Sequence, residues 1–91
     1  MKNPAWQKFI HLCAQCKTKQ QLNDLFAVFL TMAEQEDIAA RYTILTQLLK
    51  NKKPQRAIAK ELKVSIAKIT RGSNAIKIAS KNTLCLLKGK Q

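Results

Sequence analysis

Apolar residues recur at intervals of three and four positions along much of this 91-residue chain. Two such sets precede residue 31, namely Trp6, Phe9, Ile10 and Cys13, and then Leu22, Leu25, Phe26, Phe29 and Leu30. Because an α-helix turns once in about 3.6 residues, this spacing places each set on one face of a helix. Only two glycines and two prolines interrupt the pattern, so we expect a compact, all-α chain.

The same spacing predicts where the first helices lie. One helix is expected over residues 4–16 and a second over residues 19–30. Thr31 and Glu34 match a capping box, in which each side chain accepts a hydrogen bond from the other residue's backbone N–H. A longer third helix should therefore begin directly after Thr31. Its expected apolar stripe consists of Ile38, Tyr42, Leu45, Leu48 and Leu49.

Residues 54–78 have the pattern of a helix-turn-helix. Pro54 suits the start of a short helix over residues 55–62, because the first turn of a helix does not need the N–H that proline lacks. Ser65 is a good N-cap for a second helix over residues 66–78. The apolar or small residues expected between the two helices are Ile58, Ala59, Leu62, Val64 and Ile69.

The turn of this motif carries Lys63 at a position where glycine is common. If Lys63 adopts a left-handed conformation, the strain is of order 1 kcal/mol, because its Cβ approaches the following carbonyl oxygen. A last short helix and a basic tail are expected over residues 79–91, which brings the expected total to about six helices.

The net charge of +12 lies entirely in the second part of the chain. The first 37 residues carry four basic and four acidic residues, whereas residues 38–91 carry thirteen basic residues and one acid, Glu61. Such an asymmetry indicates a polyanionic partner. A basic amphipathic membrane-surface protein is disfavoured, because the lysines are not confined to the polar face of one helix.

The basic residues and the helix-turn-helix together predict binding to double-stranded DNA. In this motif the N-terminal turns of the second helix enter the major groove, and here they hold Ile66, Ala67, Lys68 and Thr70. Arg56 could contact either guanine or phosphate. One such helix gives little specificity, so a two-fold dimer that reads half-sites about 34 Å apart is expected.

Other classes of function find little support. Cys13 and Cys16 form a C-x-x-C beside His11, but only Cys85 could add a further thiolate, so we expect no metal site. No grouping typical of catalysis is present, and no enzyme is expected. The sequence contains neither a transmembrane stretch of about 18 apolar residues nor a secretory signal, which predicts a cytoplasmic protein with reduced cysteines.

The nine-residue run IAKITRGSN at positions 66–74 resembles the Trp repressor family. The similarity extends over essentially the whole chain, through Trp6, residues 25–26, residues 30–31, Arg41, residues 48–49 and residues 55–56. The resemblance implies an intertwined homodimer that represses transcription by binding operator DNA when L-tryptophan is bound as corepressor. Genes of tryptophan biosynthesis or uptake would be its targets.

The resemblance also implies which residues hold the ligand. In the family the indole lies between two arginines, which match Arg41 and Arg71, and guanidinium planes both stack on an indole and pair with a carboxylate. Thr31 would help Arg71 to hold the carboxylate, and Gly72 would leave room beside the helix. The candidate ligand-binding residues are Val28, Leu30, Thr31, Arg41, Arg71, Gly72 and Ala75, with backbone carbonyls around Val28 and Leu30 receiving the ammonium group.

The candidate DNA-binding residues are Gln55, Arg56, Ala59, Ser65, Ile66, Ala67, Lys68 and Thr70. The chain departs from the family at three positions, where Ala75 replaces a serine beside the ligand, Ala59 a lysine and Lys68 a threonine. The alternative interpretation is a regulator of the same fold that does not respond to tryptophan, with Thr31 only a helix cap, Arg41 solvated and Arg71 a phosphate contact.

The chain is predicted to form one domain, residues 1–91. Within it, residues 1–53 would supply the dimerisation helices, residues 54–78 the helix-turn-helix, and residues 79–91 the short C-terminal helix and basic tail.

Overall fold

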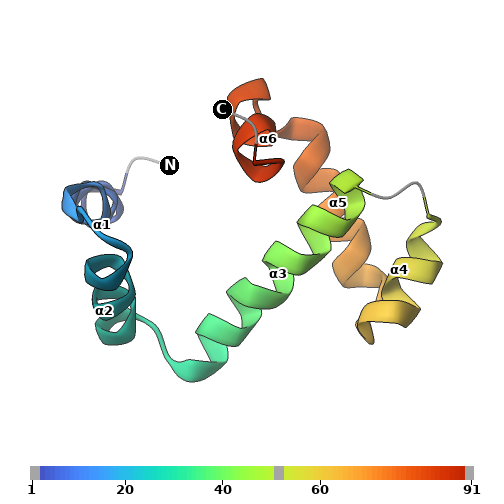
Figure 1. Cartoon of the computed structure of the whole chain (residues 1–91), viewed down its shortest axis with the longest axis horizontal. Coiled ribbons are helices and arrows are strands. Elements are labelled where there is room, and N and C mark those ends of the chain that lie inside the picture. Colours follow the sequence, from blue (N-terminus) through green and yellow to red (C-terminus); the bar gives the residue numbers. More distant parts are fainter. Residues whose placement is uncertain (1–2, 51–52, 90–91) are drawn as a thin grey trace. The chain divides into compact units, whose positions relative to one another are not determined.

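The computed structural model describes residues 3–50 and 53–89, which form six α-helices and no β-strand (Figure 1). The helices are α1 (Pro4–Gln15), α2 (Lys19–Phe29), α3 (Met32–Lys50), α4 (Gln55–Leu62), α5 (Ile66–Ile78) and α6 (Lys81–Leu87). The predicted all-α fold class is therefore confirmed. Within the described ranges, no helix has the length and apolar content needed to cross a membrane.

The chain divides into two compact units, one ending at Gln35 and the other beginning at Glu36. In the first unit, side-chain caps fix the starts of α1 and α2. Asn3 Oδ1 accepts hydrogen bonds from the backbone N–H groups of Ala5 (3.0 Å) and Trp6 (3.4 Å). Thr18 Oγ1 caps α2 in the same way, by accepting from the N–H of Gln21 at 3.0 Å.

Aromatic contacts join α1 to α2. The ring of Phe9 lies with its centroid 4.9 Å from that of Phe29 and 6.2 Å from that of Phe26. Despite these contacts, neither helix has a fully buried residue. The apolar faces of the first unit are therefore incompletely covered within one chain.

The capping box predicted at the start of α3 is present. The backbone N–H of Thr31 donates to Glu34 Oε1 at 2.8 Å, and the N–H of Glu34 donates to Thr31 Oγ1 at 3.1 Å. The first hydrogen bond lowers the pKa of the Glu34 carboxyl below its ordinary value, because it stabilises the ionised form, and the Thr31 side chain adds to this effect.

The helix-turn-helix forms with the predicted bounds. Ser65 Oγ caps α5 by accepting from the backbone N–H of Lys68 at 3.3 Å. Lys63 adopts the left-handed conformation, with φ 58° and ψ 42°, so the predicted strain falls on a residue that has a Cβ. This turn closes when the N–H of Val64 donates to the carbonyl of Ala59 at 3.0 Å.

The second unit contains the core. Four residues are buried, namely Ile44, Ile58, Ala59 and Ile69, and the partly buried side chains of Leu48, Leu62 and Val64 pack against them. The five residues expected between α4 and α5 all belong to this core. A last helix, α6, starts at the Ser80 cap, and residues 90 and 91 of the predicted tail lie outside the described residues.

The stripe predicted for α3 is only partly right. Ile38 and Tyr42 are 49% and 61% exposed, whereas Ile44, which the stripe omits, is only 3% exposed. Apolar residues occur on several sides of α3, so spacing alone did not identify the side that faces α5. Ile44 faces α5 because Ile58 and Ile69 of the helix-turn-helix pack there.

Candidate ligand pocket and nucleic-acid interface

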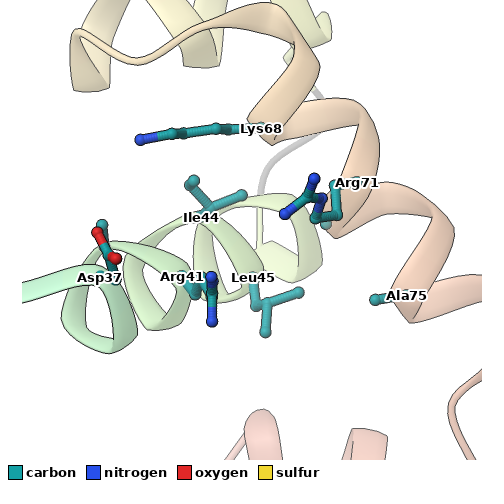
Figure 2. A pocket seen from close by; sticks show the side chains of 9 residues that line it. Asp37, Arg41, Ile44, Leu45, Lys68, Arg71 and Ala75 are labelled. Carbon is teal, nitrogen blue, oxygen red and sulfur yellow. The ribbon is translucent and has the colours of Figure 1, made fainter. Parts of the chain in front are cut away.

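A cavity of about 470 Å³ lies between α3 and α5 in the second unit (Figure 2). Each helix lines it with residues spaced three, four and seven positions apart, which share one helical face. The lining residues are Asp37, Ala40, Arg41, Ile44 and Leu45 of α3, and Lys68, Arg71, Gly72 and Ala75 of α5. An apolar floor with charged residues around it is typical of small-molecule sites.

Gly72 marks a close approach of the two helices. A Cβ added at Gly72 would lie 3.0 Å from Cγ2 of Ile44, which is tighter than ordinary packing. The sequence predicted that Gly72 leaves room for a ligand. The structure gives Gly72 a second role, because a residue without a side chain lets α5 pack closely on α3. Gly72 also lines the cavity.

The charges on the cavity wall are strongly unequal. Arg41, Lys68 and Arg71 are basic, and Asp37 is the one acidic lining residue. All four side chains are exposed, and in the described part of the chain the only ion pair is between Lys53 and Glu61, at 3.0 Å. The three cations therefore remain available to an anionic group, and arginine suits a carboxylate especially well.

The helix-turn-helix presents a basic, exposed surface. Seven of the candidate DNA-binding residues are exposed, namely Gln55, Arg56, Ser65, Ile66, Ala67, Lys68 and Thr70. Ala59 is the exception, because it is 8% exposed and belongs to the core. The structure shows the packing role that the sequence also predicted for Ala59, and its role toward DNA stays a prediction.

Comparison with known proteins places this chain in a family. The family model described as Trp repressor protein matches residues 4–90. The chain belongs to the Trp repressor family. A Trp operon repressor homolog of Chlamydia trachomatis serovar D is 49% identical over 72 residues, which cover 79% of this chain and 77% of that protein. One of Vibrio campbellii is 41% identical over 75 residues, or 82% of this chain and 75% of that protein.

Membership of the Trp repressor family confirms the resemblance inferred from the run at positions 66–74. It also identifies the chain as a regulator rather than an enzyme, as the sequence predicted. The relatives are linked by name to the Trp operon, which connects the family with tryptophan-related repression.

The structure brings four of the seven candidate ligand-binding residues of this Trp repressor family member to one cavity. These are Arg41, Arg71, Gly72 and Ala75. Val28, Leu30 and Thr31 lie in the first unit, at the end of α2 and the start of α3. Their role toward a ligand stays a prediction, while the capping role of Thr31 is established by its hydrogen bonds.

Sequence reasoning missed part of the cavity wall. Asp37, Ala40, Ile44 and Leu45 were not among the candidate residues, and Lys68 was assigned to DNA alone. The signal for Asp37 was its spacing, because it precedes Arg41 by four residues and so shares its helical face. The same spacing connects Lys68 with Arg71 and Gly72 on α5.

None of the three cysteines is among the lining residues of this cavity. Cys13, Cys16 and Cys85 are free thiols, and the first two are half-buried near the end of α1. Among residues 3–50 and 53–89, no three His, Cys, Asp or Glu side chains gather as a metal site.

Proposed function

We propose that this chain is a sequence-specific DNA-binding repressor that L-tryptophan activates as corepressor, and that it controls genes of tryptophan biosynthesis or uptake. The observation that carries the proposal is the presence of Arg41 and Arg71 on opposite helices of one cavity. Two guanidinium groups can stack on an indole and one can pair with the ligand carboxylate. A volume of about 470 Å³ falls in the range of small-molecule sites, about 300–1,000 Å³.

The position of the cavity supports a direct effect of the ligand on DNA binding. Lys68, Arg71 and Gly72 lie on α5, whose N-terminal turns are the part of a helix-turn-helix that enters the major groove. A ligand wedged between α3 and α5 would hold α5 at the angle that DNA requires. The ligand can shift this equilibrium only by its difference in affinity for the two orientations.

The proposed active form is an intertwined homodimer. No described residue of α1 or α2 is fully buried, and large apolar side chains on these helices are exposed, including Trp6, Val28 and Phe29. A second copy would cover such faces, since apolar surface is stabilised when it is removed from water. Two recognition helices would then read half-sites about 34 Å apart. We place this dimer in the cytoplasm, with its operator DNA.

A gel-shift titration tests the proposal. Purified protein is mixed with the DNA upstream of its own gene and of tryptophan-synthesis genes, with and without L-tryptophan. We expect a sequence-specific complex that requires L-tryptophan. Specific binding that is equal without the ligand would instead support a regulator of the same fold that does not respond to tryptophan, an alternative consistent with Ala75 at a position where the family has serine.

Calorimetry with L-tryptophan tests the pocket separately. Arg41→Ala and Arg71→Ala should each abolish the heat of binding while the circular dichroism of the helices stays unchanged. Arg56→Ala is the matched control, because it removes an exposed arginine from α4, which does not line the cavity. Unchanged tryptophan affinity in both pocket variants would refute this assignment.

A further inference from the structure

A C-x-x-C pair crosses the end of α1. Cys13 lies in the last turn of this helix, and Cys16 is the C-cap residue, from which the chain continues in an extended conformation. Both thiols are free and half-buried, and neither lines the cavity between α3 and α5. The proposed function gives this pair no role.

We propose that Cys13 and Cys16 form a reversible thiol–disulfide site whose reaction partner is a small disulfide such as oxidised glutathione. The bond would close within one chain, across the last turn of α1. This inference goes beyond the proposed function and does not depend on it, because its test requires neither tryptophan nor DNA.

The backbone at the end of α1 brings the two residues together. The N–H of Cys16 donates to the carbonyl of Cys13 at 3.2 Å, a hydrogen bond between residues three positions apart. Such a bond is typical of a 3₁₀ turn, in which side chains three apart eclipse each other, whereas in the body of an α-helix their Cβ atoms are about 5–6 Å apart. A disulfide needs Cβ atoms about 3.5–4.5 Å apart, so the tighter turn favours its closure.

Little holds the Cys16 side chain in its present position. Its Sγ donates to the backbone carbonyl of Leu12 at 3.8 Å, and a thiol is a weak donor. Rotation about the Cα–Cβ bond that carries the Cys16 sulfur toward Cys13 therefore breaks only one weak contact. Cys85, by contrast, is exposed on α6, and that helix holds no second cysteine.

The reaction is thiol–disulfide exchange in two steps. One cysteine thiolate attacks a sulfur of oxidised glutathione, which forms a mixed disulfide and releases one molecule of reduced glutathione. The second thiolate then attacks the cysteine sulfur of the mixed disulfide and releases the other glutathione. The two thiols of the chain lose two electrons and two protons in total, and the two glutathione molecules take them up. Excess reduced glutathione reverses both steps.

Closure of the disulfide would restrict the chain where it leaves α1. Only Lys17 and Thr18 separate Cys16 from the start of α2, and the Oγ1 atom of Thr18 caps that helix. The bond would thus act on the connection between two helices of the first unit. In cytosolic proteins such disulfides are transient and serve catalysis or redox sensing. Redox sensing is the use that suits a member of a regulator family.

Equilibration of the full-length protein in glutathione buffers tests the proposal. Free thiols are alkylated and the protein is digested with trypsin, which cleaves after Lys8 and Lys17, so Cys13 and Cys16 fall in one peptide, residues 9–17. As the share of oxidised glutathione rises, this peptide should lose both alkylation sites together. It should regain both in excess reduced glutathione.

A second measurement separates the effect of the fold from that of the spacing. The equilibrium constant for forming the disulfide is determined for the folded chain and for the same chain in concentrated urea. Because the tight turn positions the two thiols, the constant should be several-fold larger in the folded chain. An equal or smaller constant would mean that the spacing alone closes the bond, and it would overturn the role assigned to the end of α1.

Cys85→Ser is the matched control, because it removes the exposed thiol of α6 and should leave the constant unchanged. Cys13→Ser and Cys16→Ser should each eliminate the disulfide in the peptide of residues 9–17, while circular dichroism shows that the helices remain. The proposal is overturned if this peptide keeps both alkylation sites in every buffer. It is also overturned if Cys13 or Cys16 pairs instead with Cys85 or with another chain.

Discussion

Gly72 of α5 stands against Ile44 of α3 with no space for a side chain between them, since an added Cβ would lie 3.0 Å from Ile44 Cγ2. Cδ1 of Leu48 would be nearly as close, at 3.2 Å. Ile44 cannot easily yield, because it is 3% exposed and a β-branched side chain has few alternative rotamers. The distance between α3 and α5, and with it the shape of the cavity, therefore depends on a glycine at position 72.

Gly72→Ala should destabilise the protein by about 1 kcal/mol. Overpacking a core costs about 1–3 kcal/mol, and the better helix propensity of alanine offsets about 1 kcal/mol of that. Urea unfolding at fixed protein concentration measures the difference. Asn74→Ala, at an exposed position of α5, is the control and should be neutral or slightly stabilising. A stabilised Gly72→Ala variant would show that Ile44 and Leu48 can move aside.

Lys63→Gly should stabilise the helix-turn-helix by about 0.5–1 kcal/mol. Lys63 has φ 58° and ψ 42°, a conformation that costs about 1–2 kcal/mol for a residue with a Cβ, whereas glycine adopts it freely but loses more entropy on folding. The midpoint of urea unfolding should rise accordingly. Lys63→Ala distinguishes strain from charge, because alanine removes the lysine charge but keeps the Cβ. The stability of this variant should therefore rise little. Equal gains in both variants would instead identify the lysine charge as the cause.

The helix-turn-helix was predictable because its signals are local. Ser65 caps the helix that follows it, and Ile58 and Ile69 supply the contacts between the two helices over a short stretch of chain. The spacing along α1 and α2 predicted both helices for the same reason. Each of these features depends on neighbours in the sequence, so a window of about 11–18 residues is enough to reveal it.

The cavity could not be predicted in full, because it depends on how α3 packs against α5. Spacing on α3 suggested an inner stripe that includes Ile38 and Tyr42, but the buried residue is Ile44. Apolar residues that a partner subunit could cover look the same in sequence as those that the chain covers itself. Lys68 illustrates a second limit, because a residue near the start of α5 can line the cavity and also remain exposed to solvent, so its position in the sequence does not show which partner it serves.

The capping box predicts a pH-dependent contribution of Glu34 to stability. The backbone N–H of Thr31, followed by its side chain, lowers the pKa of Glu34 from its ordinary value of 4.5. A carboxyl with a lowered pKa in the folded state stabilises the fold fully above its unfolded pKa, and this stabilisation is lost as the pH falls through the folded value. Glu34→Gln should therefore destabilise the protein at neutral pH and have a smaller effect in acid.

Urea unfolding across this pH range measures the Glu34 contribution. Thr31→Ala is the reciprocal variant, which removes the hydroxyl that caps α3 and should cost about 1 kcal/mol. It should also reduce the pH dependence, because the Thr31 side chain contributes to the lowered pKa. A difference between wild-type protein and Glu34→Gln that stays constant with pH would contradict this account.

Arg56 should contact a DNA phosphate rather than a base. It is the second residue of α4, and the first helix of a helix-turn-helix crosses the DNA backbone. The affinity for DNA falls as salt rises, and each phosphate contact adds about 0.9 to the steepness of log affinity against log salt. Arg56→Gln should therefore make this slope shallower by about 1.8 in a dimer, which loses two contacts.

Fluorescence anisotropy at several salt concentrations, on operator and unrelated duplexes, measures this slope. The affinity should fall equally on both duplexes, and Lys8→Gln on α1 should change neither slope. A loss confined to the operator would mean that Arg56 reads guanine.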